Sequence, residues 1–177
     1  NLANLEVLKI TDALTGDIDA SRFDAINSFV LAAGLGAANT AISSVASGVT
    51  VEIGAAAVTN TWELAVNITN ATLAGNNSDV VNVKLTDAAG AGTSDTGVLN
   101  LVGVDTLNID TTQVATGTTT LYQVGVAATS TALDNVVVTG NTGLYIDTDL
   151  TSSLASFDAS GMTLSAVTST GVTMSIA

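Results

Sequence analysis

The chain has 177 residues, enough for one large or two small domains, and contains neither Cys nor His. Disulfides, thiol chemistry and Ser-His-Asp or Cys-His catalysis are therefore excluded, as is the commonest ligand of transition metals. Sixteen acidic residues against three basic ones give a formal net charge of −13, which argues against binding to nucleic acid phosphates and anionic lipids.

The composition predicts a protein rich in β-strands. Hydrophobic residues make up 47% of the chain and aromatic residues only 3%, and there is no proline. The apolar residues are mostly Val, Leu, Ile and Ala, beside many Thr, Asn, Ser and Asp; this vocabulary favours strands joined by tight turns. No stretch approaches 18 consecutive apolar residues, so the sequence predicts no transmembrane helix. Because the chain starts at Asn1 without Met, we expect residues 1–177 to be one β-rich module of a larger surface protein.

Alternating apolar and polar residues predict about a dozen short strands along the chain. In chain order these are residues 5–10, 28–32, 49–53, 62–68, 81–85, 98–102, 106–109, 119–126, 135–139, 144–147, 153–157 and 171–176. Two segments between them lack this pattern. Residues 36–47 are rich in Ala and Ser and predict a small-residue loop or a short helix, and residues 87–97 are rich in Gly and predict a surface loop.

One strand-and-turn pattern occurs twice, near opposite ends of the chain. It begins Leu-x-Ile, passes through an acidic turn to Leu-Thr, and ends in Asp-Ala-Ser, at residues 8–21 and 144–160; residues 83–87 repeat its beginning. Recurrence of this kind is typical of stacked β architectures. We therefore predict an all-β fold, a parallel β-solenoid with irregular rungs. A β-sandwich, which would contain a similar number of strands, is the alternative.

Clustered aspartates suggest a cation site. Asp12, Asp17 and Asp19 share one turn-rich segment, and Asp147 and Asp149 follow a strand two residues apart. Ca²⁺ takes several oxygen ligands from carboxylates and carbonyl groups on turns, so these five residues are our candidate calcium ligands. The alternative role for each is an Asx-turn or a cap, in which Asp binds nearby backbone N–H groups. The sequence contains neither an EF-hand loop nor a Gly-Gly-x-Gly-x-Asp repeat.

We predict that the chain is not an enzyme. Two pairs of the same aspartates have the residue type that hydrolyses glycosidic bonds. However, the chain offers only Trp62, Tyr122 and Tyr145 as Trp or Tyr rings to stack on sugars. A β-helical enzyme acting on polyuronates is disfavoured as well, because three basic residues are few for an anionic substrate.

Three short phrases resemble those of bacterial surface-layer proteins of the Caulobacter type, which are relatives of RTX proteins. They are Val-Gly-Val-Asp-Thr-Leu-Asn-Ile at 102–109, Val-Val-Thr-Gly-Asn-Thr-Gly-Leu at 137–144 and Ser-Phe-Asp-Ala-Ser at 156–160. The resemblance is clearest over residues 98–177 and fainter over residues 5–31. It implies an extracellular, self-assembling protein with a calcium-stabilised β-solenoid body, exported by type I secretion. Because this chain lacks the family's glycine-aspartate repeats, no ligand residue is carried over.

These observations together predict a self-assembling structural module of a bacterial surface layer, stabilised by Ca²⁺. Its expected partners are further copies of itself and a cell-surface polysaccharide. The competing hypothesis is an adhesin module that binds a carbohydrate or another surface. An exposed patch around Trp62, Tyr122 or Tyr145 would favour the adhesin.

Overall fold

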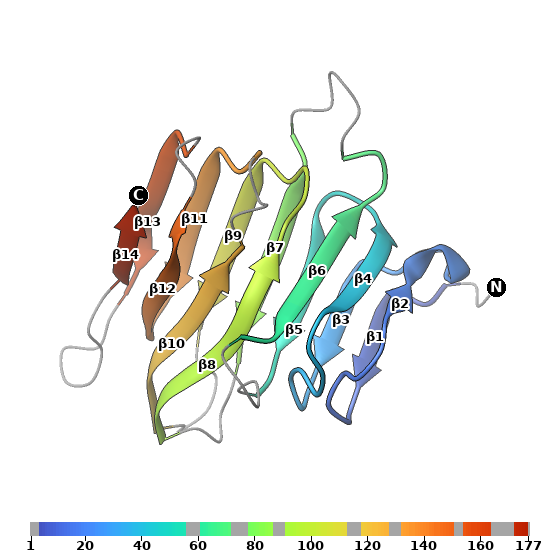
Figure 1. Cartoon of the computed structure of the whole chain (residues 1–177), viewed down its shortest axis with the longest axis horizontal. Helices are drawn as coiled ribbons and strands as arrows, with labels where there is room; N and C mark the ends of the chain where they lie inside the picture. The colour runs from blue at the N-terminus through green and yellow to red at the C-terminus, as the bar shows by residue number, and fades with distance from the viewer. Residues whose placement is uncertain are drawn as a thin grey trace.

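The chain folds into two sheets, and the strands of each sheet stack along one common axis (Figure 1). The computed structural model describes residues 4–55, 61–71, 78–86, 91–112, 118–127, 132–150, 154–163 and 172–176. Within these ranges, side chains are not described for residues 91–93, 118–120, 147–150 and 172–176.

Over the described residues each sheet contains seven strands, and the chain alternates between the sheets. Sheet one consists of β1 (Val7–Ile10), β3 (Ser28–Leu31), β5 (Val49–Ile53), β7 (Val80–Leu85), β9 (Thr106–Thr111), β11 (Asn135–Gly140) and β13 (Ser156–Met162). Sheet two consists of β2 (Ile18–Asp19), β4 (Thr40–Val45), β6 (Glu63–Ile68), β8 (Ala91–Asn100), β10 (Thr118–Val126), β12 (Gly143–Leu150) and β14 (Val172–Ile176).

All strand pairs are parallel, so each turn of the chain adds one strand to each sheet. This arrangement is a parallel β-solenoid, and the predicted fold is confirmed over the alternative sandwich. A single turn of 3₁₀ helix, η1 (Ala20–Arg22), follows β2. Among the described residues, no helix is long and apolar enough to cross a bilayer.

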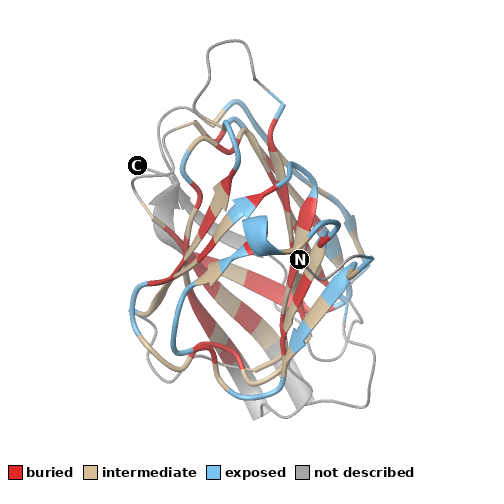
Figure 2. Ribbon diagram, turned by 90° about the vertical axis from the view of Figure 1, so that its right-hand side faces the viewer, coloured by how far each residue is buried: buried red, intermediate tan, exposed pale blue. Residues whose placement is uncertain are grey.

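The core lies between the two sheets and consists of rows of apolar side chains. Figure 2 shows buried positions alternating with less buried ones along the strands. In sheet one, Phe29 pairs with Val51, Val51 with Val83, and Val83 with Ile109. Each of these four side chains is at most 1% exposed. Because side chains alternate between the faces of a strand, the residues on either side of each row point outward.

The predicted core positions in the repeated pattern are confirmed. Leu144 and Ile146 of β12 are fully buried, and Leu8 and Ile10 of β1 are partly buried against the core. The difference in burial follows from position, because β1 is the end strand of sheet one while β12 has a neighbour on each side.

The two copies of the repeated pattern do not occupy equivalent positions in the solenoid. Residues 8–10 lie in β1 of sheet one, whereas residues 144–146 lie in β12 of sheet two. The spacing of true register partners is also uneven, since Val7 pairs with Ser28 but Val49 pairs with Val81. The repeated phrase therefore reflects strand-and-turn chemistry that both sheets use, and not the structural repeat.

The loop or short helix expected at residues 36–47 is wrong, because residues 40–45 form β4. A β-bulge hides this strand from pattern analysis. Between Ser43 and Val45 the pairing with β6 shifts by one residue, and Ser44 has a positive φ of 61°. Ile42 and Val45 therefore both face the core with two residues between them, which breaks the expected alternation.

The surface loop expected at residues 87–97 is corrected in its second part, since residues 91–97 belong to β8; residues 87–90 lie outside the described residues. Ser94 and Thr96 are buried in this strand, whereas exposed loop residues were expected. The Thr96 hydroxyl donates to the Gln123 carbonyl at 3.0 Å, so its burial leaves no polar group unpaired.

Gly140, at the end of β11, packs closely on the preceding turn. Its φ is +123°, and a Cβ at this position would lie 2.6 Å from the Thr111 carbonyl carbon and 2.7 Å from the Thr112 nitrogen. Thr111 is itself fully buried, with its hydroxyl donating to the Thr142 carbonyl at 2.7 Å. Only glycine fits both the backbone conformation and the space.

The burial of Ile146 gives a first test of the register. We expect Ile146→Ala to lower the free energy of unfolding by about 2–5 kcal/mol, because the truncation leaves a cavity in the core. Ile10→Ala should cost less, since Ile10 is only partly buried, and Thr139→Ala at an exposed position is the control. Urea denaturation measures all three. A cost below about 0.5 kcal/mol at Ile146 would contradict this packing.

Three glycine variants separate backbone strain from close contact. Gly140→Ala should lower the free energy of unfolding by more than about 2 kcal/mol, because strain and contact add. Gly48 has a φ of +86°, but a Cβ there would meet no other atom. Gly48→Ala should therefore lower the free energy of unfolding by about 1–2 kcal/mol. Gly16→Ala, with open space and no such φ, should be nearly neutral. Equal costs at Gly140 and Gly48, measured by urea denaturation, would rule out the close contact.

Candidate functional site

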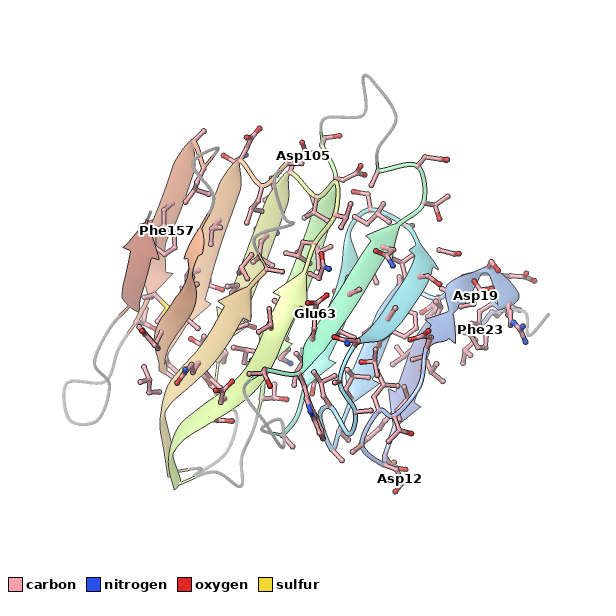
Figure 3. The ribbon with its side chains drawn as sticks, viewed as in Figure 1. Asp12, Asp19, Phe23, Glu63, Asp105 and Phe157 are labelled. Atoms are coloured by element: carbon pink, nitrogen blue, oxygen red, sulfur yellow. The ribbon has the colours of Figure 1, made fainter. Side chains whose placement is uncertain are left out.

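The first group of predicted calcium ligands lies on the first turn of the solenoid. Asp12 follows β1, while Asp17 and Asp19 flank Ile18 in β2, and all three are exposed. Figure 3 shows Asp12 and Asp19 well separated, with Asp19 beside η1. The structure thus brings Asp17 and Asp19 to one strand and leaves Asp12 apart from Asp19.

Asp17 and Asp19 both accept hydrogen bonds from the backbone. Asp17 Oδ1 accepts from Ala41 N at 2.9 Å, and Asp19 Oδ1 accepts from Ser21 N at 3.1 Å, which caps η1. Hydrogen bonds from the Ser21 hydroxyl and backbone N–H hold the pKa of Asp19 below its ordinary value, with smaller contributions from the Ser44 hydroxyl and the Arg22 guanidinium. The Asp19 contact is the capping role considered as the alternative to calcium binding, whereas the Asp17 contact joins two successive turns of the solenoid.

A hollow of about 400 Å³ lies beside these two aspartates. Its lining residues are Asp17, Ile18, Asp19, Arg22, Phe23 and Ser43. The Ser43 hydroxyl donates to the Ile18 carbonyl at 3.3 Å, so the hollow is built across β2 and β4.

The second group of predicted ligands lies far along the stack. Asp147 and Asp149 belong to β12, near the opposite end of sheet two from β2, so the two groups cannot share one ion. The side chains of these two residues lie outside the described part of the structure. Among the side chains that are described, no three of Asp and Glu gather as a metal site would need. Calcium binding by the five aspartates therefore stays a prediction.

A row of aspartates that sequence reasoning missed stacks at the corner before sheet one. The Asp79 carbonyl accepts from the N–H groups of Asp105 and Thr106, each at 3.0 Å, and the Asp105 carbonyl accepts from Asp134 and Asn135, each at 2.9 Å. Asp105 Oδ2 also accepts from Asp79 N at 2.9 Å. The available signal was the recurrence of Asp-x-(Val or Leu)-x-(Val or Ile) at the start of β7, β9 and β11.

The outer face of sheet one carries two rows of polar side chains. The first, here called the charged row, contains in register Lys9, Val30, Glu52, Lys84, Asp110 and Thr139. The second, here called the amide row, contains in register Ser28, Thr50, Asn82, Asn108 and Val137. Two of the chain's three basic residues, Lys9 and Lys84, lie in the charged row.

Contacts within these rows fix several of the side chains. Asn108 Nδ2 donates to Asn82 Oδ1 at 2.8 Å, and Asn82 Nδ2 donates to the Gly48 carbonyl at 2.9 Å. Lys84 Nζ lies 3.7 Å from Glu52 Oε2 in a half-exposed ion pair. A hollow of about 270 Å³ lies between the rows and spans β5, β7, β9 and β11.

The aromatic residues do not form the exposed patch that would favour an adhesin of the expected kind. Tyr122 is fully buried in the core, while Trp62 and Tyr145 are half-buried. Tyr145 pairs in register with Gln123 on the outer face of sheet two, and Trp62 directly precedes β6. Tyr122 is therefore corrected from a candidate contact residue to a core residue.

A comparison with known proteins finds no matching family, no similar curated protein and no similar solved structure.

The Asx-turn of Asp158 predicts a pH effect. Hydrogen bonds from the Ser160 backbone N–H, at 2.8 Å, and then from its hydroxyl lower the pKa of Asp158. A lowered folded-state pKa contributes stability that is present above the ordinary aspartate pKa of about 3.9 and is lost as the pH falls through the lowered value.

Asp158→Asn removes this titration and keeps the side-chain oxygen that the turn uses. We expect wild type to melt at a higher temperature than Asp158→Asn at pH 5–6, and the gap to close on acidification below about pH 3.9. When Asp158→Asn is added to the Ser160→Ala variant, which lacks the hydroxyl donor, the melting temperature should fall by less than it does in wild type. Thermal melts at each pH measure it, and a gap that persists unchanged at pH 2 would contradict the role of the charge.

Proposed function

We propose that this chain is a structural, non-enzymatic module of an extracellular bacterial surface layer that assembles by continuing its two sheets end to end. The observation that carries the proposal is that, among the described strands, the end strand of each sheet has a neighbour on one side only at both ends of the stack. In sheet one, β1 and β13 each pair with one described neighbour, as do β2 and β14 in sheet two. Unpaired parallel edges are templates for further strands.

Apolar side chains at both edges support this mode of assembly. Val7 of β1 is 50% exposed, and Leu8 beside it is partly buried. At the other end, Leu154, Phe157 and Met162 are partly buried; Figure 3 shows Phe157 at that end of the stack. A further turn stacked on either edge would cover these side chains and add backbone hydrogen bonds, which is how solenoid proteins gain stability.

The proposed location and the proposed role of Ca²⁺ rest on the resemblance to surface-layer proteins and on the net charge. The phrases at 102–109 and 156–160 that resemble surface-layer proteins suggest the extracellular location and export by type I secretion. A net charge of −13 opposes close packing of copies, because like charges repel. Ca²⁺ at the exposed aspartates would relieve that repulsion; extracellular calcium sites bind at about 10⁻⁴–10⁻³ M, so millimolar Ca²⁺ is the relevant range.

Assembly is tested by sedimentation velocity over a concentration series, in excess EDTA and in several millimolar Ca²⁺. We expect larger species to form with concentration and Ca²⁺ to favour them. Val7→Lys should weaken assembly, because it replaces an exposed apolar side chain by a second cation beside Lys9 on the outward face of the end strand β1. Val102→Lys is the matched control, since Val102 is 41% exposed but lies in the middle of the stack, between β8 and β9.

Three results would each contradict one part of the proposal. A monomer at all concentrations in both conditions, or equal effects of the two lysine variants, would contradict end-to-end stacking. Assembly that is the same in EDTA and Ca²⁺ would contradict only the calcium part. Asp17→Asn and Asp19→Asn keep the side-chain oxygens that accept backbone hydrogen bonds and remove charge, so they then test whether these two residues mediate the calcium effect.

A further inference from the structure

We propose that the hollow on the outer face of sheet one is a binding site for an uncharged, extended polysaccharide that lies along the solenoid axis. The proposal does not depend on end-to-end assembly, because the hollow lies within one chain, on four strands that are all described.

The shape of the hollow suits a segment of a linear polymer. Its volume of about 270 Å³ is just below the range of about 300–1,000 Å³ that is typical of sites enclosing whole small molecules. It runs across β5, β7, β9 and β11, between the charged row and the amide row. The floor is backbone at Val83 and Ile109, because their side chains are 1% exposed and face the core.

The spacing of the polar groups matches a repeating ligand. Successive strands lie about 4.8 Å apart, so groups at one register position recur at that interval along the axis. A linear chain of pyranose rings has a repeat close to this spacing. Asn82 and Asn108 sit at equivalent positions on neighbouring strands, as do Lys84 and Asp110.

Hydrogen-bonding capacity remains at these groups after their internal contacts. Asn108 gives one amide hydrogen to Asn82, and among the described residues its Oδ1 has no partner. Asp110 Oδ1 accepts from Thr112 N at 2.8 Å, its Oδ2 has no partner within the described ranges, and the Thr139 side chain is exposed. The Asn82–Asn108 bond holds the amides in place, so less conformational entropy is lost on binding.

Charge selects an uncharged polymer. The hollow is lined by one cation, Lys84, and one anion, Asp110, and Lys84 also pairs with Glu52 outside the lining. The site therefore has no net positive charge to attract a polyuronate, and a chain of net charge −13 repels one. The lining contains no aromatic residue, so the polymer would be held by hydrogen bonds without stacking of sugar rings. We expect a weak affinity, about 1 mM per site, strengthened when several copies bind one polymer.

Native gels containing a dissolved polymer test this directly, because the acidic protein migrates well in them. The probes are hydroxyethylcellulose, galactomannan and dextran as uncharged polymers, polygalacturonate as a charged one, and denatured casein as an extended polypeptide. We expect at least one uncharged polymer to retard the wild-type chain. Asn108→Leu and Thr139→Val should each weaken the apparent affinity about three- to tenfold, as expected for a lost hydrogen bond.

Asn67→Leu is the matched control, since Asn67 is a half-buried, outward-facing Asn on β6 of sheet two. It should be retarded like wild type. Circular dichroism melts verify folding, and the exposed Thr139→Val keeps the test decisive if Asn108→Leu unfolds. The proposal is overturned if no uncharged polymer retards the chain, if only polygalacturonate or casein does, if both hollow variants bind like wild type, or if Asn67→Leu loses binding equally.

Discussion

Parallel, in-register pairing of successive turns is the constraint on which the rest of this structure depends. Each inner strand hydrogen-bonds to the equivalent strand of the turns before and after it, about 4.8 Å away, so outside the β-bulges its side chains lie between two others at the same register position. At inner positions, apolar side chains must therefore pack against apolar side chains of the neighbouring turns. One buried row of this kind consists of Phe29, Val51, Val83 and Ile109. The core is therefore continuous along the axis, and each turn is stabilised mainly by its neighbours.

Sequence analysis finds the strands of this fold where alternation is regular and loses them where it is not. The strands of sheet one from β3 to β11 follow the expected pattern because their inner residues are large and aliphatic or aromatic. Sheet two is harder to predict: β2 has two residues, the bulge at Ser44 interrupts β4, and small residues such as Ser94 and Thr96 face inward in β8. Each exception depends on a contact with the next turn, which a single sequence does not reveal.

The candidate sites show the same contrast between features that a local sequence pattern predicts and features that depend on contacts between turns. The capping role of Asp19 was predictable, and its contact with Ser21 N shows it, whereas the contact of Asp17 with Ala41 N joins two turns of the solenoid and was not predictable. The hollow on sheet one was not predictable, because it joins residues from four strands whose spacing along the chain is uneven. Register alone decides that Asn82 lies beside Asn108, and register becomes visible only when the turns are stacked.

Electrostatics explains how the outer face of sheet one, which carries the hollow, stays close to neutral in an acidic chain. Like charges at one register position repel at strand spacing, so a stacked row must vary its charge or have its charges compensated. The charged row varies, with Lys84 between Glu52 and Asp110. The corner row stacks three aspartates, and the Asp79 N–H compensates the Asp105 carboxylate between them. Because backbone N–H groups at turns and corners can accommodate acids, an acidic chain can keep one sheet face close to neutral, and such a face can approach an uncharged polymer without electrostatic cost.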